Sequence, residues 1–235
     1  MTNGARSVSL IIPSLFLSGF ATQPAVILTG LLLIDIALTF GSPVGIMGQI
    51  TTLSSTLAVI FSLLMGVLSI RFKHKSLLMM GLFFFSISAL SCYFAPNFNT
   101  FLICYSISGV GMAMVAPMAG TLVADHFPLD KRTSAMGWIY AGAALSYIIG
   151  APLIGFIAGF GGWRLPFLAF VMPISLLSLL LVAKGLPSTL RSQQPTMSRM
   201  NYFEGFKGIF LNRSATACLV GNALISASWQ MSLYS

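Results

Sequence analysis

Long stretches without a charged residue are the feature that most restricts how this chain can fold. Uncharged and mainly apolar runs occupy Ser7–Ile34, Ile36–Ile70, Ser76–Ala124, Thr133–Trp163, Leu165–Ala183 and Ser214–Ser235. A helix that crosses a bilayer needs about 20 apolar residues in a row. Because only 7% of the residues are charged, the chain cannot cover a surface that faces water. The sequence therefore predicts an all-α integral membrane protein.

Seven membrane-spanning helices are expected. The run Ser76–Ala124 must hold two of them, because it is interrupted by APNFNT (Ala95–Thr100), in which Pro and Asn favour a turn. The predicted helices lie near residues 8–33, 46–70, 76–95, 99–124, 134–160, 163–184 and 212–235. The first could extend to Phe40, since LLLIDIALTF is still largely apolar, and it is too long for the apolar core of a cleaved signal peptide.

Residues 186–211 differ from every other connection in the chain. Pro, Ser and Gln are frequent in their first half, and NYFEGFKGIF then places aromatic and aliphatic residues near helical spacing. This composition predicts a linker that ends in a short amphipathic piece. Residues 1–185 would then form a six-helix bundle, and residues 212–235 would begin a second bundle that is missing from the sequence.

The positions of the basic residues predict the orientation in the membrane. If the amino terminus is cytoplasmic, every one of the twelve Lys and Arg residues except Arg164 faces the cytoplasm. Such an asymmetry is typical of multi-pass proteins of the cytoplasmic membrane. We therefore expect the amino terminus and the linker to be cytoplasmic. Since the charges sit in short clusters between apolar runs, the net charge of +8 reflects topology and does not indicate a nucleic-acid partner.

No residue pattern indicates catalysis, a metal site or a cofactor. His74 and His126 lie far from any cluster of Ser or Cys. The three cysteines, Cys92, Cys104 and Cys218, have apolar neighbours and no metal-ligand spacing. We therefore expect no enzymatic activity, no cofactor and no bound metal.

A basic connection, GVLSIRFKHK (Gly66–Lys75), follows the second predicted helix. Together with the six predicted helices and the long linker, this connection resembles the major facilitator superfamily of secondary transporters. The family's pattern between its second and third helices is roughly Gly-x-x-x-Asp-Arg-x-Gly-Arg-Arg/Lys. The matching positions are Gly66, Arg71 and Lys75. The resemblance implies a loop that holds two bundles together in the outward-facing state, and a glycine that lets two helices approach closely. Ile70 replaces the acidic residue, which weakens this role, and simple anchoring by positive charge is the alternative.

Two further stretches resemble the same family. DHFPLDKRTSAMG (Asp125–Gly137) resembles its signature between the fourth and fifth helices, and implies that Asp125 pairs with Arg71 and braces the cytoplasmic ends of helices two and four. Small residues in the fifth helix predict a smooth packing face and resemble a motif of drug-efflux antiporters. They are Gly142, Ser146, Gly150, Pro152 and Gly155. The implied fold is the six-helix amino-terminal half, a 3+3 inverted repeat, with a seventh helix of an incomplete second half.

The resemblance also implies a cargo site near the middle of the bilayer, between two bundles. The candidate cavity residues on this side are Gln23, Thr29, Tyr105, Ser108 and Tyr140. For the hydroxyl groups, bonding back to the helix's own backbone is the alternative, and for Tyr105 it is packing. Many proton-driven members carry an arginine where Tyr105 stands, which removes one candidate for proton coupling.

Asp35 is the remaining candidate for coupling to protons, and a solvated residue at the outer end of the first helix is the alternative. A neutral, aromatic cavity favours ion-coupled efflux of a lipophilic or weakly polar solute. The alternatives are an inactive half that needs the missing carboxy-terminal bundle or a second copy, and a uniporter or symporter of a neutral metabolite. The expected partners are thus the lipid bilayer, a small-molecule substrate and protons.

Overall fold

The computed structural model describes residues 3–186 and residue 221, and this part of the chain contains helices and no strand. The expected all-α membrane fold is confirmed, because six helical stretches in the described part are long and apolar enough to cross a bilayer. The predicted linker (186–211) and the predicted seventh helix (212–235) lie outside the described residues, apart from Leu186 and Gly221.

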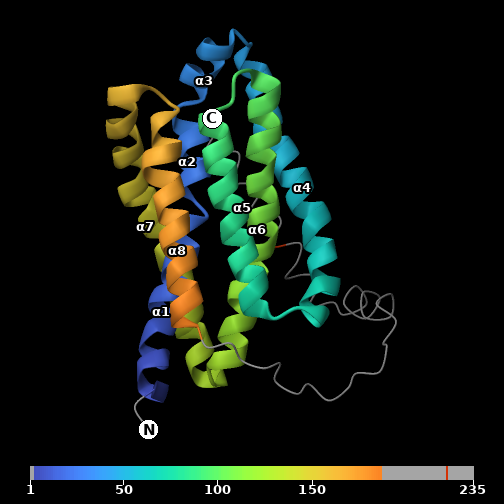
Figure 1. Cartoon of the computed structure of the whole chain (residues 1–235), viewed down its shortest axis with the longest axis vertical. Coiled ribbons are helices and arrows are strands. Elements are labelled where there is room, and N and C mark those ends of the chain that lie inside the picture. Colours follow the sequence, from blue (N-terminus) through green and yellow to red (C-terminus); the bar gives the residue numbers. More distant parts are fainter. Residues whose placement is uncertain (1–2, 187–220, 222–235) are drawn as a thin grey trace. The chain divides into compact units, whose positions relative to one another are not determined.

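Short connections join the helices in the described part of the chain (Figure 1). The bounds are α1 (Asn3–Ala21), α2 (Pro24–Leu31), α3 (Leu33–Phe40), α4 (Val44–Arg71), α5 (His74–Tyr93), α6 (Phe98–His126), α7 (Leu129–Gly161), the π-helical turn η1 (Phe167–Val171) and α8 (Met172–Gly185). The first crossing runs through α1 and α2, and the sixth runs through η1 and α8. Each of α4, α5, α6 and α7 makes one crossing.

The first crossing is broken in its middle, between the end of α1 and the start of α2. Pro24 has no backbone N–H and cannot bond to the carbonyl of Phe20 four residues earlier. That carbonyl instead accepts the N–H of Gln23, at 3.4 Å. Gln23 therefore lies between two helices, within a membrane-spanning stretch. After α2, the helix α3 extends from Leu33 to Phe40. The helical region therefore continues beyond residue 33, where the first predicted helix is expected to end.

Most of the packing joins helices that are not consecutive in the chain. α1 lies against α7 and α8, and α4 lies against α6. α5 contacts α6 and α8, and α2 contacts α7. The broken first crossing is thus held along α7 on both sides of its break.

Glycines allow the closest approach between α1 and α7. A Cβ built on Gly142 of α7 would collide with the carbonyl oxygen of Phe16, and one built on Gly19 of α1 would collide with the carbonyl oxygen of Ile139. Two backbones that come this close require residues without side chains at both positions. The contact fixes α7 next to the break in the first crossing.

The small residues of α7 divide into two groups. Three of them are buried in the bundle: Gly142, Ser146 and Gly150. The other two, Pro152 and Gly155, are exposed among the described residues. A Cβ on Gly155 would have Leu31 as its nearest neighbour, at 3.9 Å. The close packing face is therefore shorter than the five-residue pattern suggests.

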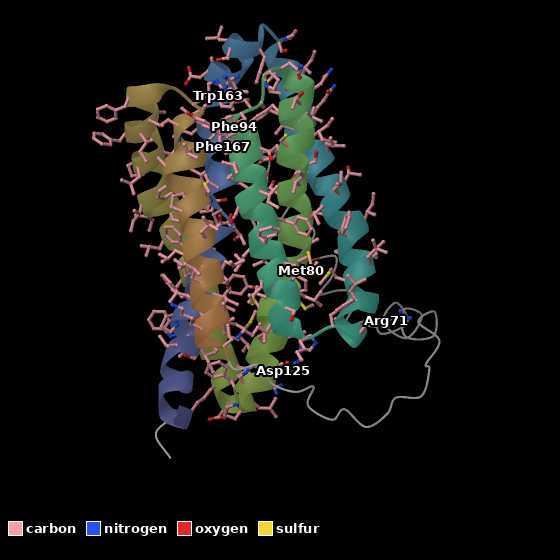
Figure 2. The ribbon with its side chains drawn as sticks, in the orientation of Figure 1. Arg71, Met80, Phe94, Asp125, Trp163 and Phe167 are labelled. Carbon is pink, nitrogen blue, oxygen red and sulfur yellow. The ribbon has the colours of Figure 1, made fainter. Side chains whose placement is uncertain are left out.

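The two ends of the bundle differ in chemistry. One end, here called the basic end, carries the described residues Arg71, Lys73, Lys75, Lys131, Arg132 and Lys184 at the ends and starts of helices. The opposite end, here called the aromatic end, holds Trp163 and Phe167 with Phe101 and Phe40, which form five ring contacts with centroids 5.2–6.3 Å apart. Figure 2 shows Arg71 and Asp125 at the first end and Trp163 at the second.

Candidate functional site

A chain of hydrogen bonds joins α7 to the break in the first crossing. The hydroxyl of Tyr147 donates to Oε1 of Gln23 at 3.2 Å, and Nε2 of Gln23 donates to Oγ1 of Thr22 at 3.0 Å. The hydroxyl of Thr22 donates in turn to the carbonyl of Gly19, at 2.7 Å. Gln23 and Tyr147 are half-buried. The contact places a neutral amide and a phenol side by side in the middle of the crossing.

Tyr147 is a polar residue of the fifth predicted helix that the sequence offers beside Tyr140, but it is not among the five selected cavity candidates. Its partner is 124 residues away in the chain. Tyr147 follows the buried Ser146 directly, and the spacing of residues along the helix does not predict which neighbour its side chain contacts. Its contact with Gln23 depends on α2 and α7 being neighbours.

A second polar bridge joins α2 to α6. Oγ1 of Thr29 and the hydroxyl of Tyr105 lie 3.2 Å apart, and the Tyr105 hydroxyl also donates to the carbonyl of Ala25 at 3.5 Å. Only 1% of Thr29 and 2% of Tyr105 is exposed. The structure thus brings two predicted cavity residues together, but in a closed position between helices.

The remaining predicted residues do not join either bridge through side-chain contacts. The hydroxyl of Ser108 donates to the carbonyl of Tyr105 at 2.6 Å, within its own helix. Tyr140 is 67% exposed on α7. Asp35 is exposed in the first turn of α3, near the aromatic end, where its carbonyl accepts the hydroxyl of Thr39 at 2.8 Å.

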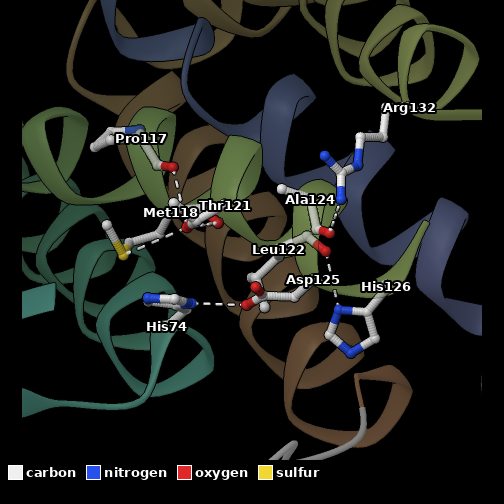
Figure 3. Close-up of polar contacts among 9 residues, drawn as sticks. All are labelled: His74, Pro117, Met118, Thr121, Leu122, Ala124, Asp125, His126 and Arg132. Atoms are coloured by element: carbon white, nitrogen blue, oxygen red, sulfur yellow. Dashed lines mark hydrogen bonds and ion pairs between the residues drawn. The ribbon is translucent and has the colours of Figure 1, made fainter. Parts of the chain in front are cut away.

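At the basic end, Asp125 pairs with a different residue from the one expected. Nδ1 of His74 lies 2.7 Å from Oδ2 of Asp125 (Figure 3). The structure does not place Arg71 in this contact; the first turn of α5 meets the last turn of α6 instead. Arg71 ends α4 and its side chain is exposed. The contact therefore braces α5 against α6 and leaves α4 unconnected to Asp125.

Two other basic side chains cap helices at this end. Nζ of Lys75 donates to the carbonyls of Ala183 and Leu186, at 2.7 and 2.5 Å, at the end of α8. Arg132 donates in the same way to carbonyls at the end of α6 (Figure 3). The last carbonyls of a helix have no partner within the helix, so these cations satisfy them and complement the helix dipole.

Gly66 does not mark a close helix contact within the described part of the chain. No described atom lies within 4 Å of a Cβ built on it. The physical reason expected for this glycine therefore does not apply inside the six-helix unit.

The interior of the described bundle is uncharged. Every described Asp, Lys and Arg side chain lies in a connection or in the turn of a helix next to one, at the basic end or at the aromatic end. Between these ends, the polar side chains of the described residues are hydroxyl, phenol and amide groups. Such an interior can offer hydrogen bonds to a solute but no counter-charge.

Comparison with known proteins agrees with this architecture. A family model described as Major Facilitator Superfamily matches residues 14–235. The chain is 36% identical over 108 residues to multidrug resistance protein 2 of Bacillus subtilis (strain 168), covering 46% of this chain and 26% of that protein. It is 30% identical over 155 residues to the probable sugar efflux transporter of Pasteurella multocida (strain Pm70), covering 64% of this chain and 37% of that one.

Solved structures show the same fold. A bacterial homologue of the human lysosomal transporter Spinster, in an inward-facing and unoccupied conformation, matches with a TM-score of 0.62 and 19% identity over 86% of this chain and 48% of its own. The peptide transporter POT in complex with sulfate matches with a TM-score of 0.67 and 14% identity over 93% and 47%. The chain spans less than half the length of these relatives.

Proposed function

The chain belongs to the major facilitator superfamily, and on that premise we propose that it forms the amino-terminal bundle of a carrier that moves a small solute across the cytoplasmic membrane by alternating access. The proposed cargo is lipophilic or weakly polar, and the proposed direction is efflux coupled to an ion. The bundle would rock as one body against a second bundle around a site near the middle of the bilayer.

The proposed class of cargo is inferred from the uncharged interior of the bundle. A charged side chain inside the membrane is costly and is retained where a charged substrate or a coupling ion needs it. The described residues of this bundle place their charges at its two ends. Gln23 and Tyr147 offer neutral hydrogen-bonding groups at the break in the first crossing. A solute with a large apolar body and a small neutral polar group matches the chemistry of this interior.

The direction of transport is supported by relatives. The two matched proteins described above are named as a multidrug resistance protein and a probable sugar efflux transporter. The small residues of α7 also resemble the helix-five motif of drug-efflux antiporters. Efflux by exchange with protons is therefore our proposal, with Asp35 as the coupling residue.

The proposed orientation rests on the charge asymmetry of the bundle. The described lysines lie at the basic end and Arg164 lies at the aromatic end. By the positive-inside rule, this asymmetry supports a cytoplasmic basic end. There the His74–Asp125 pair and the Lys75 cap would keep the inner ends of α5, α6 and α8 together while the bundle moves.

Vesicles with an imposed pH gradient test this function. The carrier that contains this bundle is incorporated with the basic end accessible, and movement of a lipophilic dye that carries a neutral hydroxyl group is followed by fluorescence. We expect movement that requires the protein and is abolished when a protonophore removes the gradient. Dye movement that is the same with and without protein would refute efflux of this cargo class, and movement insensitive to the protonophore would refute proton exchange.

A further inference from the structure

We propose that the Gln23–Tyr147 contact is where the polar group of the cargo is recognised, and that it selects a neutral group that both donates and accepts a hydrogen bond, such as a hydroxyl or a carboxamide. This inference rests on the proposed transport function and deepens it by naming the chemistry of the solute. It is carried by the accessibility of the pair, the fixed orientation of the amide, and the distribution of charge.

The Gln23–Tyr147 bridge is accessible, whereas the other bridge from the broken crossing is closed. Thr29 and Tyr105 are 1% and 2% exposed, so a solute cannot reach their oxygens without separating α2 from α6. Gln23 and Tyr147 are each half-buried. A solute can therefore approach this pair while the bundle keeps its packing.

The hydrogen bonds of Thr22 fix which end of the Gln23 amide faces α7. The single hydroxyl hydrogen of Thr22 is donated to the carbonyl of Gly19 at 2.7 Å. Oγ1 of Thr22 can then only accept, so its partner in Gln23 must be the NH₂ group, at 3.0 Å. Oε1 of Gln23 consequently points to Tyr147 as an acceptor.

A hydroxyl or a carboxamide can insert between the two side chains without losing a hydrogen bond. Its hydrogen goes to Oε1 of Gln23, and its oxygen accepts the hydroxyl hydrogen of Tyr147, so both protein groups remain paired. A methyl group in the same place would leave both groups without these bonds, which is unfavourable for partly desolvated polar groups.

A carboxylate is disfavoured for a different reason. Its oxygens can accept from Tyr147, but one of them would face Oε1 of Gln23, and two acceptors in contact repel. The described cations lie at the ends of the bundle and not beside this pair. An anionic solute would therefore lose its hydration without gaining a counter-charge.

Four naphthalene derivatives that differ in one substituent test the selection. The substituents are hydroxymethyl, carboxamide, methyl and carboxylate, and binding is measured by equilibrium dialysis against the purified chain in nanodiscs, with empty nanodiscs subtracted. We expect the first two to bind about three- to tenfold more tightly than the last two, the range for one or two neutral hydrogen bonds. Gln23→Leu and Tyr147→Phe should each bring hydroxymethyl binding to that of methyl and leave methyl binding unchanged.

Two variants control for loss of the same chemical groups elsewhere. Gln49→Leu removes an exposed amide from α4, and Tyr93→Phe removes a phenol hydroxyl from the end of α5; both should retain the preference. Equal affinities for the four solutes in the unmodified chain, no binding by any of them, or a preference that survives both Gln23→Leu and Tyr147→Phe would overturn the inference.

The transport assay separates this inference from the function on which it rests. If the vesicles show no gradient-driven dye movement while the binding preference and its loss in the variants persist, the proposed function fails and the recognition site stands. If dye moves with the gradient but the four solutes bind alike, the function stands and the assignment of Gln23 and Tyr147 fails.

Discussion

His74 and Asp125 meet at 2.7 Å between Nδ1 and Oδ2, and so join the first turn of α5 to the last turn of α6. The side chains are 30% and 28% exposed, so solvent screens the interaction in part. The family pattern would instead connect the acid to the arginine at the end of α4. In this bundle the brace lies between two helices that already pack along each other.

A double-mutant cycle tests this pairing. We expect a coupling free energy of about 0.2–1 kcal/mol between His74→Ala and Asp125→Ala, as for other partly exposed pairs. The cycle between Arg71→Ala and Asp125→Ala should give a coupling near zero, because Arg71 is exposed and Asp125 is paired with His74. Both are measured from unfolding in mixed micelles. A larger coupling to Arg71 than to His74 would contradict the observed brace.

Gly142 is predicted to tolerate no side chain. In Gly142→Ala the new methyl group meets the carbonyl oxygen of Phe16, so α1 and α7 must move apart, at a cost of about 1–3 kcal/mol. Gly137→Ala in the same helix is the matched control, since no described atom lies within 4 Å of its Cβ. We expect a lower thermal midpoint for the first variant and an unchanged or higher one for the second. Equal midpoints would show that the α1–α7 approach is not this close.

The helices of this bundle follow from local sequence, but their partners do not. Apolar runs bounded by charges or by turn residues locate each crossing, because the bilayer imposes both length and composition. Asp125 is different: which basic residue reaches it depends on whether α4 or α5 lies beside that turn of α6. The sequence places Arg71 and His74 three positions apart. Both α4 and α5 pack on α6, and only the contact of His74 with Asp125 distinguishes them.

The candidate site shows the same limit. Gln23 stands out in the sequence as an amide beside a proline, and the structure places it at a helix break. Tyr147 has no comparable signal, because its role depends on a contact across 124 positions. Among the small residues of α7, Gly142 and Gly155 look alike in the sequence. Only the contact with Phe16 shows which of them lies at a close backbone approach.

Lys75 is predicted to stabilise the end of α8. Lys75→Met keeps most of the apolar stem and removes the ammonium group, so the carbonyls of Ala183 and Leu186 lose their donor. We expect a loss of about 1–2 kcal/mol in the free energy of unfolding, since bonds to charged groups exceed neutral ones. Lys73→Met, at an exposed position, should change it by less than about 0.5 kcal/mol. Similar losses in both variants would indicate a general charge effect instead of a cap.

Asp35 is predicted to affect proton coupling and not the fold. Its side chain is exposed in the first turn of α3, so Asp35→Asn should leave the thermal midpoint within the range of ordinary surface substitutions. If its carboxyl group carries the exchanged proton, the amide cannot do so, and dye efflux driven by a pH gradient should stop while dye exchange without a gradient continues.

Asp130→Asn is the matched control for this substitution. Asp130 is also exposed in the first turn of a helix, but at the basic end of α7. The same loss of one negative charge there should leave gradient-driven efflux unchanged. If Asp35→Asn retains full gradient-driven efflux, the exposed position of Asp35 reflects a solvated helix end, and a proton carrier must be sought outside the described bundle. If both variants lose efflux alike, the loss reflects the change in net charge and Asp35 has no special role.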